Sequence, residues 1–147
     1  MALAQMGKIL AIIERLSSIP ARTAVLAAPG INRLIREQFR AGVDPYGRAW
    51  ADLRPATIAR GRRPPPLTDT GKLRDGTRVR PFPGRRAGLQ LVVGESYGRF
   101  HQTGTSRMVA RRILPQQGMP RAWRAVLLEA SRRACQDVSR SIGGPGE

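Results

Sequence analysis

The chain has 147 residues, enough for one domain with a modest hydrophobic core, and a formal net charge of +16 at pH 7. One cysteine excludes an internal disulfide, and one histidine leaves too few ligands for a structural zinc site. No apolar run approaches the roughly 20 residues that cross a membrane, and the start of the chain does not match a signal peptide. We expect a single domain over residues 1–142 and a flexible tail over residues 143–147.

Nearly all of the positive charge comes from arginine, because Lys8 and Lys72 are the only lysines. Such a surface attracts polyanions or an acidic protein face. The alternative is that arginine reflects a GC-rich genome and that counter-ions cover the surface. Aromatic residues make up only 5% of the chain, which gives little support for a surface that stacks the bases of single strands.

Two helical patterns open the chain. Residues 2–18 place apolar side chains at helical spacing in one stripe. A second helix is predicted over residues 19–41, where Pro29 and Gly30 either kink it or divide it, and Gly42 supplies a stop. We expect both stripes to pack in the core, with a subunit interface as the alternative. The stripes are Leu3, Met6, Ile9, Leu10, Ile13 and Leu16, then Ile31, Leu34, Ile35 and Phe39.

Turn residues dominate the next part of the chain. Residues 43–47 combine Asp, Pro and Gly, and Trp50 is expected to anchor this loop on the core. Residues 56–60 allow one helical turn. Residues 61–66 hold two arginines and three prolines, which favour an extended, exposed loop that is either a spacer or a docking segment. Asp69 or Thr70 is then expected to cap a short helical turn.

A β-hairpin is predicted after this turn. Residues 77–82 place Val79 between two arginines, which gives one apolar and one basic face. Residues 87–93 form the second strand, and residues 83–86 connect the two.

A glycine-punctuated corner follows the hairpin. Tyr97 and Phe100 are three positions apart, which predicts a short helical turn that buries both rings. His101 and Gln102 are expected to hydrogen-bond the backbone of the adjacent loop. We expect no catalytic role for His101, because no nucleophile elbow or pair of acids accompanies it. Residues 106–118 are basic and are predicted to form an irregular loop or a late strand.

The clearest helix is predicted over residues 122–142. Its single cysteine, Cys135, is expected to be a small buried hydrophobe. Together these elements predict an α+β fold, in which N-terminal and C-terminal helices pack on a small antiparallel β-sheet and long basic loops surround it. The apolar stripe of the last helix is Trp123, Val126, Leu127, Ala130, Ala134 and Val138.

Three motifs, in this order, resemble those of one family. They are Asp44-Pro45-Tyr46-Gly47 followed by Trp50, then Asp69-Thr70-Gly71-Lys72-Leu73, and then Tyr97-Gly98-Arg99-Phe100-His101-Gln102-Thr103-Gly104. Their order and spacing resemble the phage virion morphogenesis proteins, which are tail-completion or neck proteins of the Mu G type. The resemblance runs from about residue 39 to residue 123. Its structural motif residues are Pro45, Gly47, Trp50, Asp69, Thr70, Gly71, Leu73, Tyr97, His101, Gln102 and Gly104.

This resemblance implies a structural virion protein that completes the tail or joins the head to it. Such a protein is expected to form a ring, commonly of six subunits, between the head connector and the tail tube. The implied partners are copies of the chain itself, the head–tail connector, and the tail terminator and tube proteins, with packaged double-stranded DNA in the channel as a further partner. The implied location is the neck or tail region of the virion, and the host cytoplasm during assembly.

A basic nucleic-acid-binding protein is the alternative, and charge is its only argument. The sequence has no P-loop, dinucleotide motif or cluster of metal ligands, so we expect no enzymatic activity, cofactor or metal. In either case arginines of the loops are expected to make the contacts. The candidate interface or DNA-facing residues are Arg60, Arg62, Arg63, Arg85, Arg86, Arg107, Arg111 and Arg112.

Overall fold

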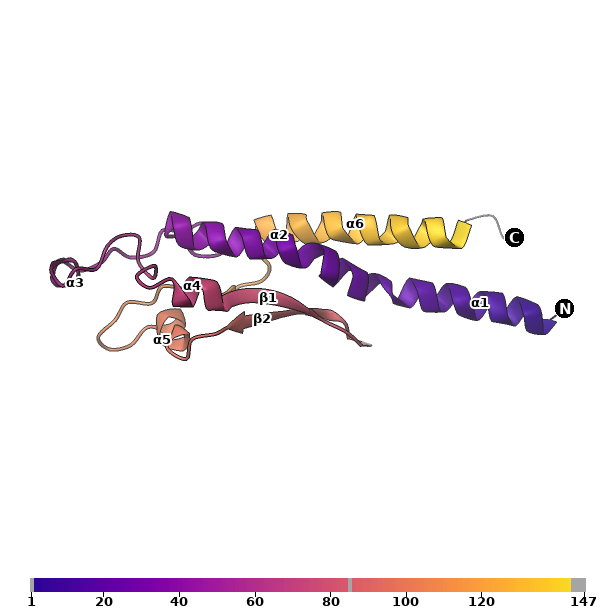
Figure 1. Ribbon diagram of the computed structural model, residues 1–147, viewed down its shortest axis with the longest axis horizontal. Coiled ribbons are helices and arrows are strands. Elements are labelled where there is room, and N and C mark those ends of the chain that lie inside the picture. The colour runs from indigo at the N-terminus through magenta and orange to yellow at the C-terminus, as the bar shows by residue number, and fades with distance from the viewer. Residues whose placement is uncertain (1, 85, 144–147) are drawn as a thin grey trace.

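The computed structural model describes residues 2–84 and 86–143, and the side chains of residues 2–4 are not described (Figure 1). Of the expected tail, Gly143 ends the last helix and residues 144–147 lie outside the described residues, as does Arg85. The elements in chain order are α1 (Ala2–Ser17), α2 (Ile19–Ala41), α3 (Pro55–Ala59), α4 (Lys72–Gly76), β1 (Thr77–Phe82), β2 (Gly88–Val93), α5 (Gly98–Thr103) and α6 (Arg121–Gly143).

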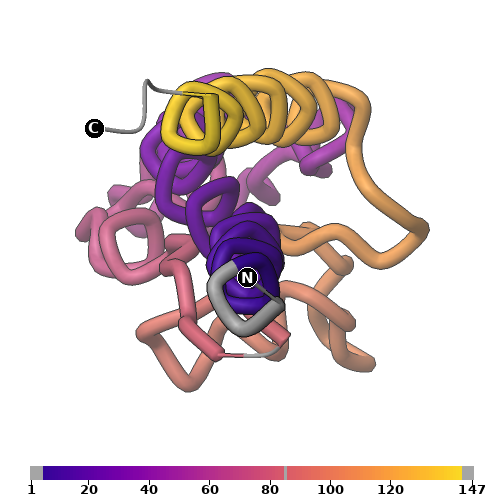
Figure 2. The backbone as a smooth tube through the Cα atoms, turned by 90° about the vertical axis from the view of Figure 1, so that its right-hand side faces the viewer, coloured from indigo at the N-terminus to yellow at the C-terminus, as the bar shows by residue number. Residues whose placement is uncertain are grey.

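The predicted α+β architecture is confirmed. The antiparallel hairpin of β1 and β2 lies on one side of α2, and α6 packs along the other side (Figure 1). The end-on view shows the same order, with α6 above and the hairpin below (Figure 2). Helix α2 therefore contacts both layers and forms the centre of the core.

Helix α2 follows the predicted stripe. Ile31, Ile35 and Phe39 recur every fourth residue and are at most 1% exposed. The helix continues through Pro29, so Pro29 and Gly30 do not divide it into two helices. At Gly30 an added Cβ would lie 2.8 Å from a methyl group of Val126, so the absence of a side chain lets α6 pack close to α2.

The loop after α2 is anchored as predicted. Trp50 is buried, its ring meets Phe39 edge to face, and its Nε1 donates a 2.9 Å hydrogen bond to the Arg112 carbonyl. The buried Asp44 carboxylate accepts hydrogen bonds from the backbone N–H groups of Tyr46 and Arg48, at 2.8 and 2.9 Å. These bonds close the turn that brings Trp50 back to the core.

Replacing Asp44 with Ala should lower the free energy of unfolding by about 1–3 kcal/mol, because two backbone N–H groups lose their acceptor. Asp44→Asn keeps an acceptor oxygen at the same place and should cost clearly less. Urea unfolding of both variants measures the difference. Equal losses for Ala and Asn would contradict the role of the turn bonds.

The hairpin matches its prediction closely. β1 has the predicted bounds and β2 starts one residue late, with Val79 opposite Leu91. Val79 is buried against the core while the arginines on either side of it are exposed. Asn32 of α2 donates to the Val79 carbonyl and accepts from its N–H, at 3.0 and 2.8 Å. This pair of hydrogen bonds fixes the free edge of β1 to α2, and the sequence pattern did not predict it.

The predicted cap of α4 is wrong. Gly71, not Asp69 or Thr70, occupies the N-cap position, and no side chain caps the helix. Gly71 has a φ of 73°, a left-handed conformation that glycine adopts without strain. The Asp69 carboxylate is therefore free to pair with Arg62 of the preceding loop.

The predicted burial of Tyr97 and Phe100 is also wrong, because both side chains are exposed. The buried residue of this corner is Gly98, where an added Cβ would lie 2.5 Å from Val93 and 3.3 Å from Leu73. Helix α5 approaches the sheet through a glycine, so its aromatic rings point elsewhere.

Helix α6 buries most of the predicted stripe. Trp123, Ala130, Ala134 and Val138 are buried, the first two in one cluster with residues of α2, and the remaining two members are partly buried. Cys135 was expected inside but is exposed, because the neighbouring Ala134 takes the position that faces α2.

The prediction that the stripe of α1 packs in the core is wrong. Residues 5–17 are all exposed, and α1 extends past the tip of the hairpin at one end of the molecule (Figure 1). The guanidinium of Arg15 donates to the Ser141 carbonyl at the end of α6. The helix is predicted correctly, whereas its apolar stripe is not covered by any of the residues that the structure describes.

Candidate functional site

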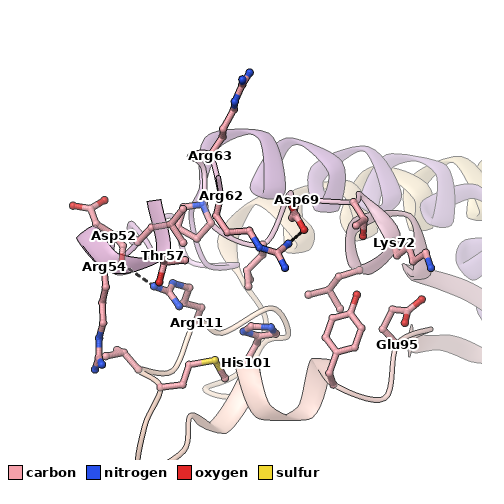
Figure 3. Close-up of a pocket in the computed structure, with 18 of the residues that line it drawn as sticks. Asp52, Arg54, Thr57, Arg62, Arg63, Asp69, Lys72, Glu95, His101 and Arg111 are labelled. Atoms are coloured by element: carbon pink, nitrogen blue, oxygen red, sulfur yellow. Dashed lines mark hydrogen bonds and ion pairs between the residues drawn. The ribbon is translucent and has the colours of Figure 1, made fainter. Parts of the chain in front are cut away.

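A basic pocket is lined by segments around α3, α4 and α5, which lie toward the end of the molecule opposite α1 (Figure 1), and Figure 3 shows it in close-up. It has a volume of about 720 Å³ and is formed by five segments, within residues 52–57, 62–63, 66–73, 95–101 and 107–111. Two of the three motif segments therefore meet two of the arginine-bearing loops here. These segments are far apart in the chain, and only the fold brings them together.

Cations outnumber carboxylates around this basic pocket by six to three. Leu53, Leu67, Leu73, Met108 and Val109 add apolar surface beneath them. The charged lining residues are Arg54, Arg62, Arg63, Lys72, Arg107 and Arg111, with Asp52, Asp69 and Glu95. A site with these groups suits an acidic segment that also carries apolar side chains.

Arg111 is a structural member of the pocket. Its Nε donates to the Ala51 carbonyl at 2.7 Å, and its Nη2 donates to the Asp52 carbonyl at 2.8 Å. Burial and the nearby Arg54 lower the pKa of Arg111, but a guanidinium stays protonated in proteins. Arg111 therefore fixes one wall and brings a positive charge to it.

The other guanidiniums of the pocket are exposed. Arg62 lies across the pocket and pairs with Asp69, as Figure 3 shows, while Arg63 points away from the cavity. Arg54 and Arg107 are also exposed at the rim. Because an exposed ion pair is weak, a partner carboxylate can take the place of Asp69 on Arg62 at little cost.

His101 lines the pocket and differs from its prediction. Its Nδ1 is buried, and no hydrogen-bond partner for it lies among the described residues. The ring meets Tyr97 edge to face, with centroids 6.1 Å apart, and it is the His101 backbone carbonyl that accepts from the N–H of Arg111 at 2.7 Å. Burial, and then the charge of Arg111, lower the pKa of His101.

This lowered pKa predicts a loss of stability on acidification. The unfolded chain protonates His101 near its ordinary pKa of about 6.5, whereas the folded chain resists protonation until lower pH. The contribution of neutral His101 to the free energy of unfolding is therefore complete above pH 6.5. It is lost as the pH falls through the pKa that His101 has in the folded chain. Urea midpoints between pH 7.5 and 5 should fall less for His101→Gln than for the unmodified chain, and parallel curves would contradict this.

Gln102 holds the loop behind the pocket, as predicted. Its Oε1 accepts from the N–H groups of Ile113 and Leu114 at 2.8 and 2.9 Å, and its Nε2 donates to the Leu114 carbonyl at 2.9 Å. Gln38 of α2 donates to the Ile113 carbonyl at 3.0 Å. Two side-chain amides thus supply the hydrogen bonds that a neighbouring strand would otherwise make to this backbone. They hold residues 113–114 of the irregular loop over residues 106–118 in place.

The structure distributes the predicted arginines over three places. Arg62, Arg63, Arg107 and Arg111 line the basic pocket. Arg60 is exposed beside it after α3, and Arg112 is partly buried where its carbonyl accepts from Trp50. Arg86 is exposed at the hairpin turn, and Arg85 lies outside the described residues.

The proline loop before α4 is less exposed than predicted. Pro66 is buried, and Pro65 approaches the backbone at Gly42. Residues 60–64 are the exposed part. Arg54 was missed by the sequence reasoning, because nothing in its local pattern distinguishes it from other surface arginines.

Within residues 2–84 and 86–143, no group of three or more His, Cys, Asp or Glu side chains is placed to hold a metal ion. None of the helices described there has the length and apolar character needed to span a bilayer. Protein-family models, curated proteins and solved structures give no match to this chain. The assignment of function therefore depends on the motifs and on the geometry of the pocket.

Proposed function

We propose that the chain is a structural protein of a phage neck or tail end, which forms a ring between the head connector and the tail tube. The basic pocket is the observation that carries this proposal. Two of the three motif segments that resemble the tail-completion family line it, and they do so beside the arginine loops at residues 60–63 and 107–111. Motif and charge thus coincide at one surface.

The pocket supports this function as a docking site for another component of the junction. The fork of Arg62 can pair both oxygens of a carboxylate, and the side chains of Leu67 and Met108 can receive an apolar neighbour. Because the pocket lies at one end of an elongated molecule, a partner there leaves the long sides free for contacts between subunits (Figure 1). Head-to-tail contacts of this kind close into a ring.

The test removes the exposed charge from the pocket in cells that produce the particle. The triple substitution Arg54→Ser, Arg62→Ser and Arg107→Ser should leave the melting temperature nearly unchanged, since surface changes usually cost under about 0.5 kcal/mol each. It should raise the fraction of unjoined heads and tails seen by electron microscopy. A tagged copy, located by gold labelling, should lie at the neck or tail end.

A matched control removes three exposed arginines from α6, with Arg121→Ser, Arg124→Ser and Arg133→Ser. It lowers the net charge by the same amount and should leave particles intact. Joined particles in normal yield from the pocket variant, or absence of the label from particles, would overturn the proposal.

The net charge of +16 keeps a nucleic-acid-binding protein as the second candidate. Non-specific binding depends on total charge, so both triple variants should then lose affinity for a DNA duplex to a similar degree. Each phosphate contact removed should reduce the slope of log K against log salt by about 0.9. Fluorescence anisotropy over a salt series measures this slope. Equal losses, with normal joining of particles, would favour the second candidate.

A further inference from the structure

The apolar stripe of α1 is the largest feature that the basic pocket does not explain. It consists of Met6, Ile9, Leu10, Ile13 and Leu16, each of them 49–60% exposed. Lys8, Ala11 and Arg15 lie on the opposite side of the helix, as a period of 3.6 residues requires. Arg15 bonds the end of α6, so the stripe faces away from that contact.

A helix exposed in this way requires a partner. A 16-residue helix is only marginally stable in water without a packed apolar face. The five side chains present on the order of 500 Å² of apolar surface, the size of the largest apolar patch on a typical soluble monomer, which is often a functional one.

We propose that α1 packs against the α1 helices of neighbouring copies of this chain. Met6, Ile9, Ile13 and Leu16 follow a 3-4-3 spacing, which is the a/d pattern of helices that pack on one another. Leu10 widens the stripe on one side, so that each helix can contact two neighbours, as a ring of subunits requires. In such a ring, adjacent copies would share about 500 Å² of buried α1 surface, and the rest of the roughly 1,000 Å² of a specific interface would come from the long sides of the molecule.

The charge distribution leaves the α1 stripe as the surface where a second copy meets the least repulsion. Copies of a chain with a net charge of +16 repel one another over most of their surface. The described part of α1 carries only Lys8, Glu14 and Arg15, and its stripe is uncharged. Association through this stripe therefore brings the copies together where repulsion is weakest.

This inference builds on the ring of the proposed function and names the surface that would form it. Helix α1 and the basic pocket lie at opposite ends of the molecule (Figure 1). Contacts between α1 helices would therefore leave every pocket open for another component.

The test compares Ile13→Glu with Ala11→Glu in the full chain by light scattering after size exclusion. Both variants add one negative charge to the same helix, but Ile13 lies in the middle of the stripe and Ala11 on the opposite face. We expect the unmodified chain and Ala11→Glu to share a mass of several subunits, and Ile13→Glu to have the monomer mass. Thermal unfolding should show that both variants are folded, since residues 5–17 are outside the core.

Cross-linking gives a second readout. In a Cys135→Ser background, Ile9→Cys should be joined between copies by a short bismaleimide, whereas Lys8→Cys should not. Assembly of the Ile13→Glu variant to the full mass would overturn the role of α1 and leave a ring through another surface possible. A monomeric unmodified chain at every concentration would overturn the ring as well.

Discussion

Trp50→Ala is expected to lower the free energy of unfolding by about 3–5 kcal/mol, as large-to-small changes at buried aromatic residues do. The indole is 6% exposed and its ring centroid lies 5.4 Å from that of Phe39. The change leaves a cavity next to α2, and it leaves the Arg112 carbonyl without the hydrogen bond that Trp50 Nε1 donates to it. Urea unfolding should show it, and the melting temperature should fall by about 10 °C or more.

Trp50→Phe is the control that separates packing from the hydrogen bond. It keeps an aromatic ring against Phe39 but removes the Nε1 donor and part of the indole volume, so its cost should be well below that of Ala. An unchanged melting temperature for Trp50→Ala would contradict the burial of this side chain.

The same change should weaken the basic pocket from behind. The Arg112 carbonyl is bound by Trp50, and the guanidinium of the preceding Arg111 is bound to the carbonyls of residues 51 and 52. The two contacts tie the loop after α2 to the loop that carries Arg107. Loss of the Trp50 contact therefore leaves the bonds of Arg111 as the remaining tie between these two walls of the pocket.

Periodicity predicted the elements whose partners lie within the chain. Residues of α2 pack against both Val79 of the hairpin and the stripe of α6, so the pattern and the burial agree. The stripe of α1 has the same periodicity, but it is exposed and none of the described residues covers it. Sequence periodicity identifies a face that must be covered, and it does not say whether the covering surface belongs to the same chain.

The candidate site was only partly predictable. The motif glycines, Gln102 and most of the arginines were identified, since turn chemistry and charge are local properties. The pocket itself depends on contacts between residues far apart, such as the pair of Arg62 with Asp69 and the bonds of Arg111 to the loop after Trp50. The exposure of Tyr97 could be inferred only from the burial of Gly98, which needs the fold.

Gly104→Ala is expected to destabilise the chain by about 3 kcal/mol or more. Gly104 has a φ of 75° and a ψ of 177°, a region that side chains essentially forbid. An added Cβ would lie 2.9 Å from the Ala110 nitrogen and 3.0 Å from the Met108 oxygen. Both atoms belong to the backbone, so the loop itself must move.

Gly118→Ala is the matched control for this effect. Gly118 also has a positive φ, of 81°, but an added Cβ would have no heavy atom within 4 Å. Its cost should be about 1 kcal/mol, which is the conformational part alone. The difference between the two variants in urea unfolding therefore measures the collision at residues 108–110, and equal costs would contradict it.

The collision at Gly104 also predicts a loss of function that, unlike the effect of Trp50→Ala, arises without a cavity in the core. Gly104 precedes the short bridge between Thr105 and Met108, and this bridge positions Arg107 at the rim of the basic pocket. A loop displaced by Ala at this position moves Arg107 while the core around Trp50 stays packed. Under conditions where Gly104→Ala is still folded, it should therefore impair the joining of heads and tails more than Gly118→Ala does. Such a result would connect the last glycine of the motif directly to the docking surface.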